Sequence, residues 1–442
     1  MASRLLAAAI LIASGLIAWL AITSSLAARL MQAVVGISVV YVGYLAFRGA
    51  QVIRAALERP ATVEAPAHLP FVNVIVPARD EASVIRDLIE DLSHQSYGAD
   101  GTRRYDVTVV DDGSSDGTGE VATDAAGYAS DASWLRVVVR PAGSTPATKA
   151  AALAWGTADL EGDVIAALDA DARVAPDFLM RVMKGWALQP DAAAIQASRL
   201  PTNAEAGWLQ RAQADEQLMD LASQCGRWAT DGSAELRGNG MFVRREVLDR
   251  VGGWNRSAIT EDLDLSTRLA AAGERIGLAP EAQVGEEAVE HLADLWPQRL
   301  RWAEGSLRRL MEHGPRLLGA RLSLQRKFDF LAFTGEFVIP PLFVAGVVTG
   351  LLSIPLPAPT DWTVPVALFV GYGLGSFLLA TAGLAAHGQR GTTLMIESTR
   401  GAIFLSHWLV VVPVALLRIA FGPPTVAFRK TPRIGHRTRS DR

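Results

Sequence analysis

The sequence predicts an α/β domain with a mostly parallel sheet, flanked by apolar helices near both ends of the chain. Half of the 442 residues are hydrophobic and only 20% are charged, which is more apolar than is usual for a soluble domain. Long apolar runs open and close the sequence, whereas its charged middle alternates between strand and helix patterns. We therefore expect a membrane-bound chain with one large water-exposed domain.

The first 47 residues contain two apolar runs, Leu5–Ile22 and Met31–Phe47. Each is close to the roughly 20 residues that cross a bilayer as a helix. Arg4 and the small-residue stretch after the first run also allow a signal peptide. Because the second run follows at once, we favour a transmembrane hairpin over residues 1–47. Both interpretations are compatible with a cytoplasmic location from residue 48 onward.

Residues 48–325 are expected to form a cytoplasmic α/β domain with interfacial helices. The expected strands are Val72–Val76, Val107–Val110, Val137–Val139 and Val164–Leu168, and the expected helices include Glu81–His94, Thr148–Trp155 and Pro176–Leu188. Strands separated by helices predict a parallel sheet. Such sheets bind ligands at the carboxyl ends of their strands.

The chain becomes apolar again at 326–424, with the segments Phe328–Leu352, Val364–Ala386 and Ala402–Phe421. Arginines dominate the tail, residues 425–442, which is typical of a cytoplasmic tail beside lipid headgroups and equally of a disordered, solubilising tail. Three crossings after a cytoplasmic domain would instead place this tail outside. Either one segment lies in the interface, or Pro340 and Pro341 break the first segment into a re-entrant pair. The sequence leaves this choice open.

The net charge and the cysteine count exclude some kinds of partner and metal site. The net charge of −4 gives no general attraction to nucleic acid, so we expect none as a partner. Cys225 is the only cysteine, which excludes an internal disulfide and zinc sites of the Cys/His finger type. A lone cysteine suits the reducing cytoplasm.

Acids and glycines directly follow the first two expected strands. The first strand leads into Pro77–Glu81, and the second into Asp111 and Asp112, followed by Gly113. Carboxylates at this edge can accept hydrogen bonds from a nucleobase or a ribose, and glycine lets a ligand approach the backbone. An ordinary turn is the alternative, because these residue types also favour turns.

A second acidic pair, Asp169 and Asp171, follows the fourth expected strand. Two carboxylates separated by one residue can converge on Mg²⁺ or Mn²⁺, which also bridges to a diphosphate. Turn or capping aspartates are the alternative. Lys149 lies between the two acidic clusters in the sequence and could pair with a diphosphate, although a lone lysine is commonly just exposed.

Two later motifs carry further candidates. Glu261 and Asp262 begin a helical run, Leu263–Ala272, which Thr260 could cap; acids in a first turn also stabilise a helix without any other role. The stretch Gln298–Trp302 is amphipathic, and its arginine and tryptophan could cover a sugar or a diphosphate. The alternative is an interfacial helix with an aromatic anchor.

Taken in order, these motifs resemble the four signatures of glycosyltransferase family 2, whose membrane-embedded branch includes cellulose, chitin and hyaluronan synthases. The matching residues are Asp111-Asp112, Asp169-Ala170-Asp171, Thr260-Glu261-Asp262 and Gln298-Arg299-Leu300-Arg301-Trp302. The resemblance implies the GT-A fold, a nucleotide-binding α/β domain. It also implies that Asp112 contacts the uridine of a UDP-sugar and that Asp262 is the general base.

The remaining roles follow the same resemblance. Asp169 and Asp171 would hold the sugar diphosphate through Mg²⁺ or Mn²⁺. The residues expected to bind the nucleotide sugar are Pro77, Glu81, Asp111, Asp112, Lys149 and Asp169. Those expected on the acceptor and diphosphate side are Glu261, Gln298, Arg301 and Trp302.

Three stretches, Glu235–Arg245, Leu295–Gly305 and Arg400–Leu409, are also similar to the cyanobacterial β-monoglucosyldiacylglycerol synthases. This resemblance implies transfer of glucose from UDP-glucose to diacylglycerol, with inversion, at a bacterial plasma or thylakoid membrane. Gln298–Trp302 favours a processive polysaccharide synthase instead, but five apolar segments are few for a polymer channel. A membrane sensor or scaffold that binds a nucleotide sugar without turnover is a further alternative. The presence of all the expected acids argues against it.

Overall fold

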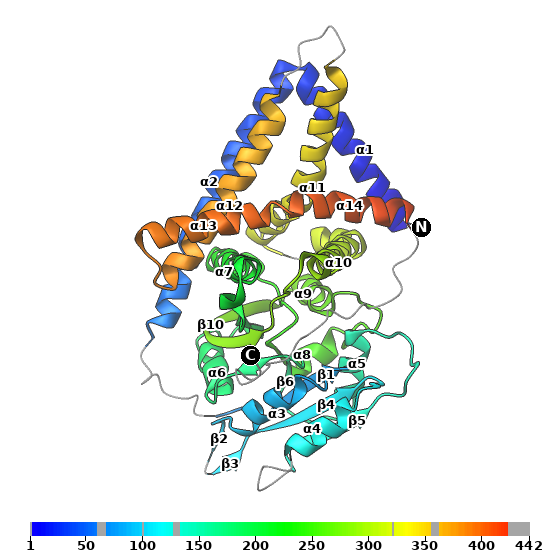
Figure 1. Ribbon diagram of the computed structural model, residues 1–442, viewed down its shortest axis with the longest axis vertical. Coiled ribbons are helices and arrows are strands. Elements are labelled where there is room, and N and C mark those ends of the chain that lie inside the picture. The colour runs from blue at the N-terminus through cyan, green and yellow to red at the C-terminus, as the bar shows by residue number, and fades with distance from the viewer. Residues whose placement is uncertain are drawn as a thin grey trace. The chain divides into compact units, whose positions relative to one another are not determined.

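The computed structural model describes residues 2–59, 68–99, 101–126, 133–320, 322–354 and 362–422 (Figure 1). Its contacts divide the chain into two compact units. Of the described residues, those within 2–54, 211–233 and 295–422 form the helical unit, and those within 55–210 and 234–294 form the α/β unit.

Over the described ranges, the α/β unit is built on an eight-stranded sheet with the order β5-β4-β1-β6-β9-β8-β10-β7. Its first four strands are parallel, β9 is antiparallel to both neighbours, and β8 pairs with β10 in parallel. The strands are β1 (Val72–Ala78), β4 (Tyr105–Asp111), β5 (Leu135–Val139), β6 (Val164–Ala167), β7 (Arg173–Val174), β8 (Ala192–Pro201), β9 (Met241–Arg244) and β10 (Arg275–Glu286). A two-stranded hairpin, β2 (Gly98–Ala99) and β3 (Thr102–Arg103), is separate from this sheet. The predicted mostly parallel α/β fold is confirmed.

The helices of the α/β unit follow the strands as the sequence predicts. They are α3 (Ile85–Ser93), α4 (Thr118–Ala126), α5 (Lys149–Gly156), α6 (Phe178–Ala187), α8 (Arg245–Arg250) and α9 (Glu261–Ala271). The first begins at Ile85 rather than at Glu81, because residues 82–84 form a turn. Just before that turn the backbone amide of Glu81 donates to Thr118 Oγ1 at 2.8 Å, so the strand end is held beside the start of α4.

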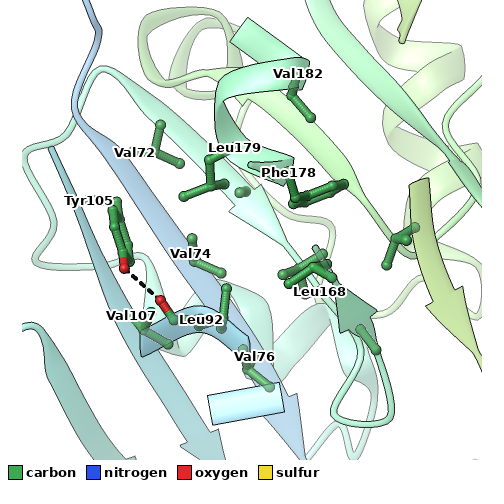
Figure 2. Close-up of a cluster of buried hydrophobic side chains, with 14 of the residues drawn as sticks. Val72, Val74, Val76, Leu92, Tyr105, Val107, Leu168, Phe178, Leu179 and Val182 are labelled. Atoms are coloured by element: carbon green, nitrogen blue, oxygen red, sulfur yellow. Dashed lines mark hydrogen bonds between the residues drawn. The ribbon is translucent and has the colours of Figure 1, made fainter. Parts of the chain in front are cut away.

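The core of the α/β unit fixes the strand ends. Val72, Val74 and Val76 alternate along β1 and are fully buried beneath α3 and α6. There they lie in one cluster with Leu92 of α3 and Phe178 of α6 (Figure 2). Tyr105 is buried with them, and its hydroxyl donates to the Leu92 carbonyl at 2.5 Å. Burying each such large side chain contributes roughly 1.5–3 kcal/mol, which makes this end of the sheet a rigid support.

The helical unit contains long apolar helices and two charged ones. Among the described residues, five segments are long and apolar enough to cross a membrane. The helices are α1 (Ala2–Thr23), α2 (Ser25–Leu57), most of α7 (Trp208–Ala229) and α10 (Leu292–Gly319), α11 (Leu324–Ser353), α12 (Thr363–Ala386), α13 (Gly391–Leu405) and α14 (Trp408–Phe421). Figure 1 shows α13 and α14 running across the direction of α1, α2, α11 and α12.

The structure differs from the sequence analysis in two of the last apolar segments. The helix α11 continues through Pro340 and Pro341, so the re-entrant break, one of the two alternatives that the sequence leaves open, does not occur. An apolar helix keeps its remaining backbone groups paired, and two prolines do not outweigh that pairing. The expected segment Ala402–Phe421 is divided at Ser406 and His407 into the end of α13 and α14. The basic tail lies outside the described residues.

Candidate active site

The carboxyl ends of β1, β4 and β6 bring three acidic loops to one edge of the sheet. Ala78 pairs with Asp111 in the register of β1 and β4, and the amide of Asp112 donates to the Ala78 carbonyl at 2.8 Å. On the other side of β1, the amide of Leu168 donates to the Ile75 carbonyl at 3.1 Å. The loops at Pro77–Glu81, Asp111–Asp112 and Asp169–Asp171 are therefore neighbours.

The two adjacent aspartates after β4 have different surroundings. Asp111 is buried, and its Oδ1 accepts from the amide of Ser114 at 2.9 Å, which holds the turn together. Asp112 accepts instead from Arg140 Nη1 at 2.5 Å, while Arg140 Nη2 donates to the Pro146 carbonyl at 2.7 Å. The arginine thus orients Asp112. Gly113 has a φ of +71°, and a side chain there would collide with Ala142.

Pro77 and Glu81 flank this pair. Both are half-buried, Pro77 as the penultimate residue of β1 and Glu81 three residues after that strand ends. Between them the strand end turns sharply at Asp80, whose φ is +55°. Asp80 is held to the β4 loop through its amide, which donates to Ser114 Oγ at 2.9 Å. The β1 and β4 loops therefore form one hydrogen-bonded wall.

Lys149 joins three separate segments on the other side of the site. It is the first residue of α5, whose N-cap Thr148 accepts from the Ala151 amide at 3.1 Å. Its Nζ lies 2.5 Å from Asp169 Oδ1 and 3.0 Å from Glu261 Oε1, and it donates to the Gly238 carbonyl at 2.9 Å. Burial opposes the lysine charge, but the two carboxylates outweigh burial and raise the pKa of Lys149.

The pair Asp169 and Asp171 follows β6 as predicted. The side chain of Asp169 is 33% exposed, whereas Asp171 is 9% exposed and accepts from the amide of Glu287 at 3.2 Å. Over the described ranges, no group of three or more His, Cys, Asp or Glu side chains could hold a metal by itself. Two carboxylates suit a divalent ion that takes its other ligands from a diphosphate and water.

Asp262 is the second residue of α9 and is half-buried. Burial raises the pKa of Asp262 to about 6, and the charge of Glu261 adds to this effect. The Leu263 amide, which donates to Asp262 Oδ1 at 2.8 Å, opposes the shift, as do Lys149 and Arg237. The carboxylate is ionised at neutral pH but binds a proton more readily than an ordinary aspartate, which suits a general base.

The start of α9 differs from prediction in one respect. Thr260 occupies the N-cap position, but its side chain caps no backbone amide, so the predicted capping bond is wrong. Asp264 is held by Asn255 Nδ2 at 3.0 Å and Arg268 Nε at 2.8 Å. The first-turn acids are therefore of two kinds, since Glu261 pairs with Lys149 whereas Asp264 braces the helix.

Sequence reasoning missed three contributors to the site. Arg140 follows β5 directly, so the rule that led to the strand-end acids could also have found it. Asn239 accepts from the amide of Asp169 through Oδ1 at 3.1 Å, and Gly238 receives Lys149. Gly238 and Gly240 have φ values of +82° and +73°, and such a Gly-Asn-Gly sequence before a strand signals a special backbone.

The remaining predicted residues, Gln298, Arg301 and Trp302, lie on α10 in the helical unit. Within that unit the guanidinium of Arg299 stacks 4.2 Å from the centre of the Trp302 ring. The expected role of Gln298, Arg301 and Trp302 toward an acceptor or a diphosphate stays a prediction.

The mostly parallel sheet with acids at its strand ends is of the GT-A type, and the family matches make the chain a nucleotide-sugar-dependent glycosyltransferase. The model of glycosyl transferase family 2 matches residues 73–252, and that of glycosyl transferase family group 2 matches residues 164–415. The chain belongs to glycosyl transferase family 2.

Curated relatives agree with this assignment, and a solved structure shares the fold. The chain is 32% identical to a β-monoglucosyldiacylglycerol synthase of Synechocystis over 82% of this chain and 74% of that protein. It is 33% identical to the synthase of the same name from Trichormus variabilis, over 84% of this chain and 78% of the relative. A mannosyltransferase from Pyrobaculum calidifontis, in complex with GDP-mannose and Mn²⁺, shares the fold with a TM-score of 0.54 and 20% identity. That likeness covers 88% of this chain and 99% of the mannosyltransferase.

Proposed function

We propose that this chain transfers glucose from UDP-glucose to 1,2-diacylglycerol, making β-monoglucosyldiacylglycerol on the cytoplasmic face of a bacterial plasma or thylakoid membrane. The proposed chemistry rests on one observation: the pKa of the Asp262 carboxyl is raised, and this residue directly follows Glu261 of the cluster formed by Lys149, Asp169 and Glu261. The choice of substrates is supported by the relatives named β-monoglucosyldiacylglycerol synthase, which match most of this chain.

The donor is proposed to bind along the acidic strand ends. Asp112, oriented by Arg140, would accept hydrogen bonds from the uracil, with Pro77, Glu81 and Asp111 also binding the nucleotide sugar. Asp169 and Asp171 would hold Mg²⁺ or Mn²⁺ beside the diphosphate. When bound, such an ion supplies Lewis-acid stabilisation of the leaving charge, worth several kcal/mol.

Transfer is proposed as a single inverting displacement. Asp262 takes the proton from the acceptor hydroxyl, and the hydroxyl oxygen attacks the anomeric carbon from the face opposite the diphosphate. The bond from that carbon to the phosphate oxygen breaks, UDP leaves with the bonding electrons, and the proton stays on Asp262. Lys149 would neutralise the departing diphosphate.

One alternative is a processive β-polysaccharide synthase of the cellulose or hyaluronan type. The presence of Gln298, Arg301 and Trp302 in their expected order favours it. The number of candidate spans speaks against it, since the described residues contain five, few for a channel that exports a polymer.

The deciding experiment uses the full chain in mild detergent with UDP-glucose, Mg²⁺ and diacylglycerol, followed by mass spectrometry of the lipid extract. A lipid heavier by one hexose, absent with Asp262→Asn, supports the proposal. A high-mass or insoluble glycan would support the processive alternative. Absence of UDP release with diacylglycerol, in a preparation that binds UDP, would contradict the proposed acceptor.

A further inference from the structure

We propose that residues 391–421, the fifth apolar segment, lie along the membrane surface instead of crossing it. The segment contains α13 and α14 and has the length and apolarity of a span. Taking α1, α2, α11 and α12 as spans, the chain then crosses four times. The inference is independent of the substrates proposed above.

One end of the segment lies on the side where α2 ends. Gly371 and Gly375 of α12 lie against Val35 and Val42 of α2, so the residue numbers of the two helices rise together and the helices are parallel. The last turn of α12 is therefore level with the second half of α2. After this turn the chain enters α13, which packs against α12.

The other end lies where α1 begins. Arg4 Nη2 donates to the carbonyl of Gly422, the residue after α14, at 2.8 Å. Ala7 is completely buried in a cluster with Val411, Val412, Ala415, Leu416 and Ile419 of α14. The first half of α1 therefore packs along α14.

The start of α1 and the end of α2 face the same side, since the two helices form a hairpin joined at Ser24 and lead away from one shared apex (Figure 1). At that apex Ala18, Ala21 and Ala28 are buried with Leu342 of α11 and Leu368 of α12. Residues 391–421 thus begin and end on one side of the bilayer, whereas a spanning helix must join opposite sides.

Three polar contacts also hold the segment against the charged helices α7 and α10. Arg400 Nε lies 2.6 Å from Asp215 Oδ2, Trp408 Nε1 donates to Glu216 Oε1 at 3.0 Å, and Arg418 Nε lies 2.8 Å from Glu304 Oε1. These partners recur every eight to ten residues along the segment. A crossing segment would carry at least one of them into the hydrocarbon, where charged groups are costly.

The charged helices themselves mark the level of the surface. Within the described residues, neither α7 nor α10 is apolar enough to span. The backbone of α7 packs against the second half of α2. Gly49 of α2 lies against Ala222 of α7, and Gly226 of α7 lies against Leu45 of α2. Their charged side chains include Asp215, Glu216, Asp220, Arg227, Arg299, Arg301, Glu304, Arg308 and Arg309.

The opposite face of the segment suits contact with lipid. Ile396 and Ile403 lie seven residues apart on one face of α13, and Val410 and Leu417 do so on one face of α14. These four side chains are 66%, 60%, 53% and 48% exposed. An in-plane helix with one face on polar helices and an apolar face outward inserts that face into the boundary between headgroups and acyl chains. The partner is therefore the bilayer surface on the side where α2 ends.

The test measures the depth of nitroxide labels on single cysteines at 396, 403, 410 and 417, in a C225S background, in proteoliposomes. Depth is obtained from the ratio of the nitroxide's collision rates with oxygen, which enters the bilayer, and with a nickel chelate, which stays in water. The inference expects one shallow depth at all four positions. Labels at Leu30, Val34, Ile37 and Val40 of α2, all more than half exposed, provide the spanning control with depths that change along the helix. A profile that deepens toward 403 and 410 and is shallow at 396 and 417 would overturn it.

A second measurement leaves the natural Cys225 in place and needs no spin label. Green fluorescent protein is fused before residue 1 or after residue 442 of the full chain in a bacterial host, with matched alkaline phosphatase fusions. Four crossings place both ends on one side, so the same reporter is active at both. Opposite reporters at the two ends would require an odd number of crossings and overturn the inference. Loss of glucose transfer would change neither result.

Discussion

Two cation–carboxylate clusters, one in each unit, use similar chemistry in different surroundings. In the α/β unit Lys149 lies between Asp169 and Glu261 at 2.5 and 3.0 Å. In the helical unit Arg227 of α7 contacts both oxygens of Asp329 of α11 at 3.0–3.1 Å. The side chain of Asp169 is 33% exposed, whereas the side chains of Arg227 and Asp329 are 2% and 1% exposed.

The helical cluster is closed. Asp329 also accepts from the amide of Ser233 at 3.0 Å, and the Phe333 ring covers the guanidinium at 4.1 Å. Planar arginine, held bidentate, fits a structural tie between two helices. The lysine cluster is more open, since the side chains of Lys149 and Asp169 are 19% and 33% exposed. It also has an excess of carboxylate, because Asp171 and Asp262 lie close by in sequence. Openness and excess carboxylate, rather than the ion pair itself, distinguish a candidate site for a metal-bound diphosphate.

The largest expected effect is at Asp262. Asp262→Asn should lower turnover about 10²- to 10⁴-fold, because the acceptor hydroxyl loses its base. UDP binding, measured by calorimetry, should be nearly unchanged. Asp264→Asn is the matched control, since Asp264 braces α9 through Asn255 and Arg268. Turnover close to normal in the Asp262 variant would show that the base is elsewhere.

Breaking the closed cluster should chiefly cost stability. Arg227→Leu leaves Asp329 buried without its counter-ion, and we expect a loss of about 3–5 kcal/mol in the free energy of unfolding. Thermal unfolding in detergent measures this loss. The double variant Arg227→Leu with Asp329→Leu should recover much of it, because no unpaired charge is left. A single variant as stable as the native chain would rule out a structural tie.

The open cluster should respond to metal instead. Asp171→Asn should weaken Mg²⁺- or Mn²⁺-dependent UDP binding by roughly 10- to 100-fold, the range typical of damage to a metal site. Binding without added metal should stay as it is, and calorimetry with and without the ion separates the two. Asp329→Asn, which touches only the closed cluster, should leave the metal dependence of folded protein unaltered. Equal metal dependence in Asp171→Asn and native protein would remove Asp171 from the metal site.

The smallest expected effect is a shift of the pH profile. Asp262 must be ionised to act as a base, so kcat/KM should fall as pH drops below about 6, the pKa of this carboxyl. The positive charge of Lys149 lowers that pKa, so Lys149→Met should raise it and move the acidic limb to higher pH. Lys149→Arg keeps the charge and should keep the limb in place. A limb that moves to lower pH in Lys149→Met would contradict this arrangement.

Much of the fold could be predicted because its signals are local. Apolar runs marked β1, β4, β5 and β6, and the acids after three of them marked the edge where ligands bind. Prediction was less successful where a partner is distant in sequence. Arg140 was missed although it directly follows a strand, because its contact with Asp112 crosses from one loop to another. The start of α3 was misplaced because residues 82–84 form a turn, and the hydrogen bond from the Glu81 amide to Thr118 beside it joins residues distant in the chain.

The sequence by itself determined the class of fold, the apolar segments and the acidic residues of the candidate site, since each depends on residue type and local period. Only the tertiary structure decided which charges meet, because Lys149, Asp169 and Glu261 come from three separate segments. It also distinguished α14 from a span, since hydropathy is the same for a helix in the plane of a bilayer and one across it. The contacts of its two ends, with Arg4 and with α12 through α13, depend on the packing of helices distant in the chain.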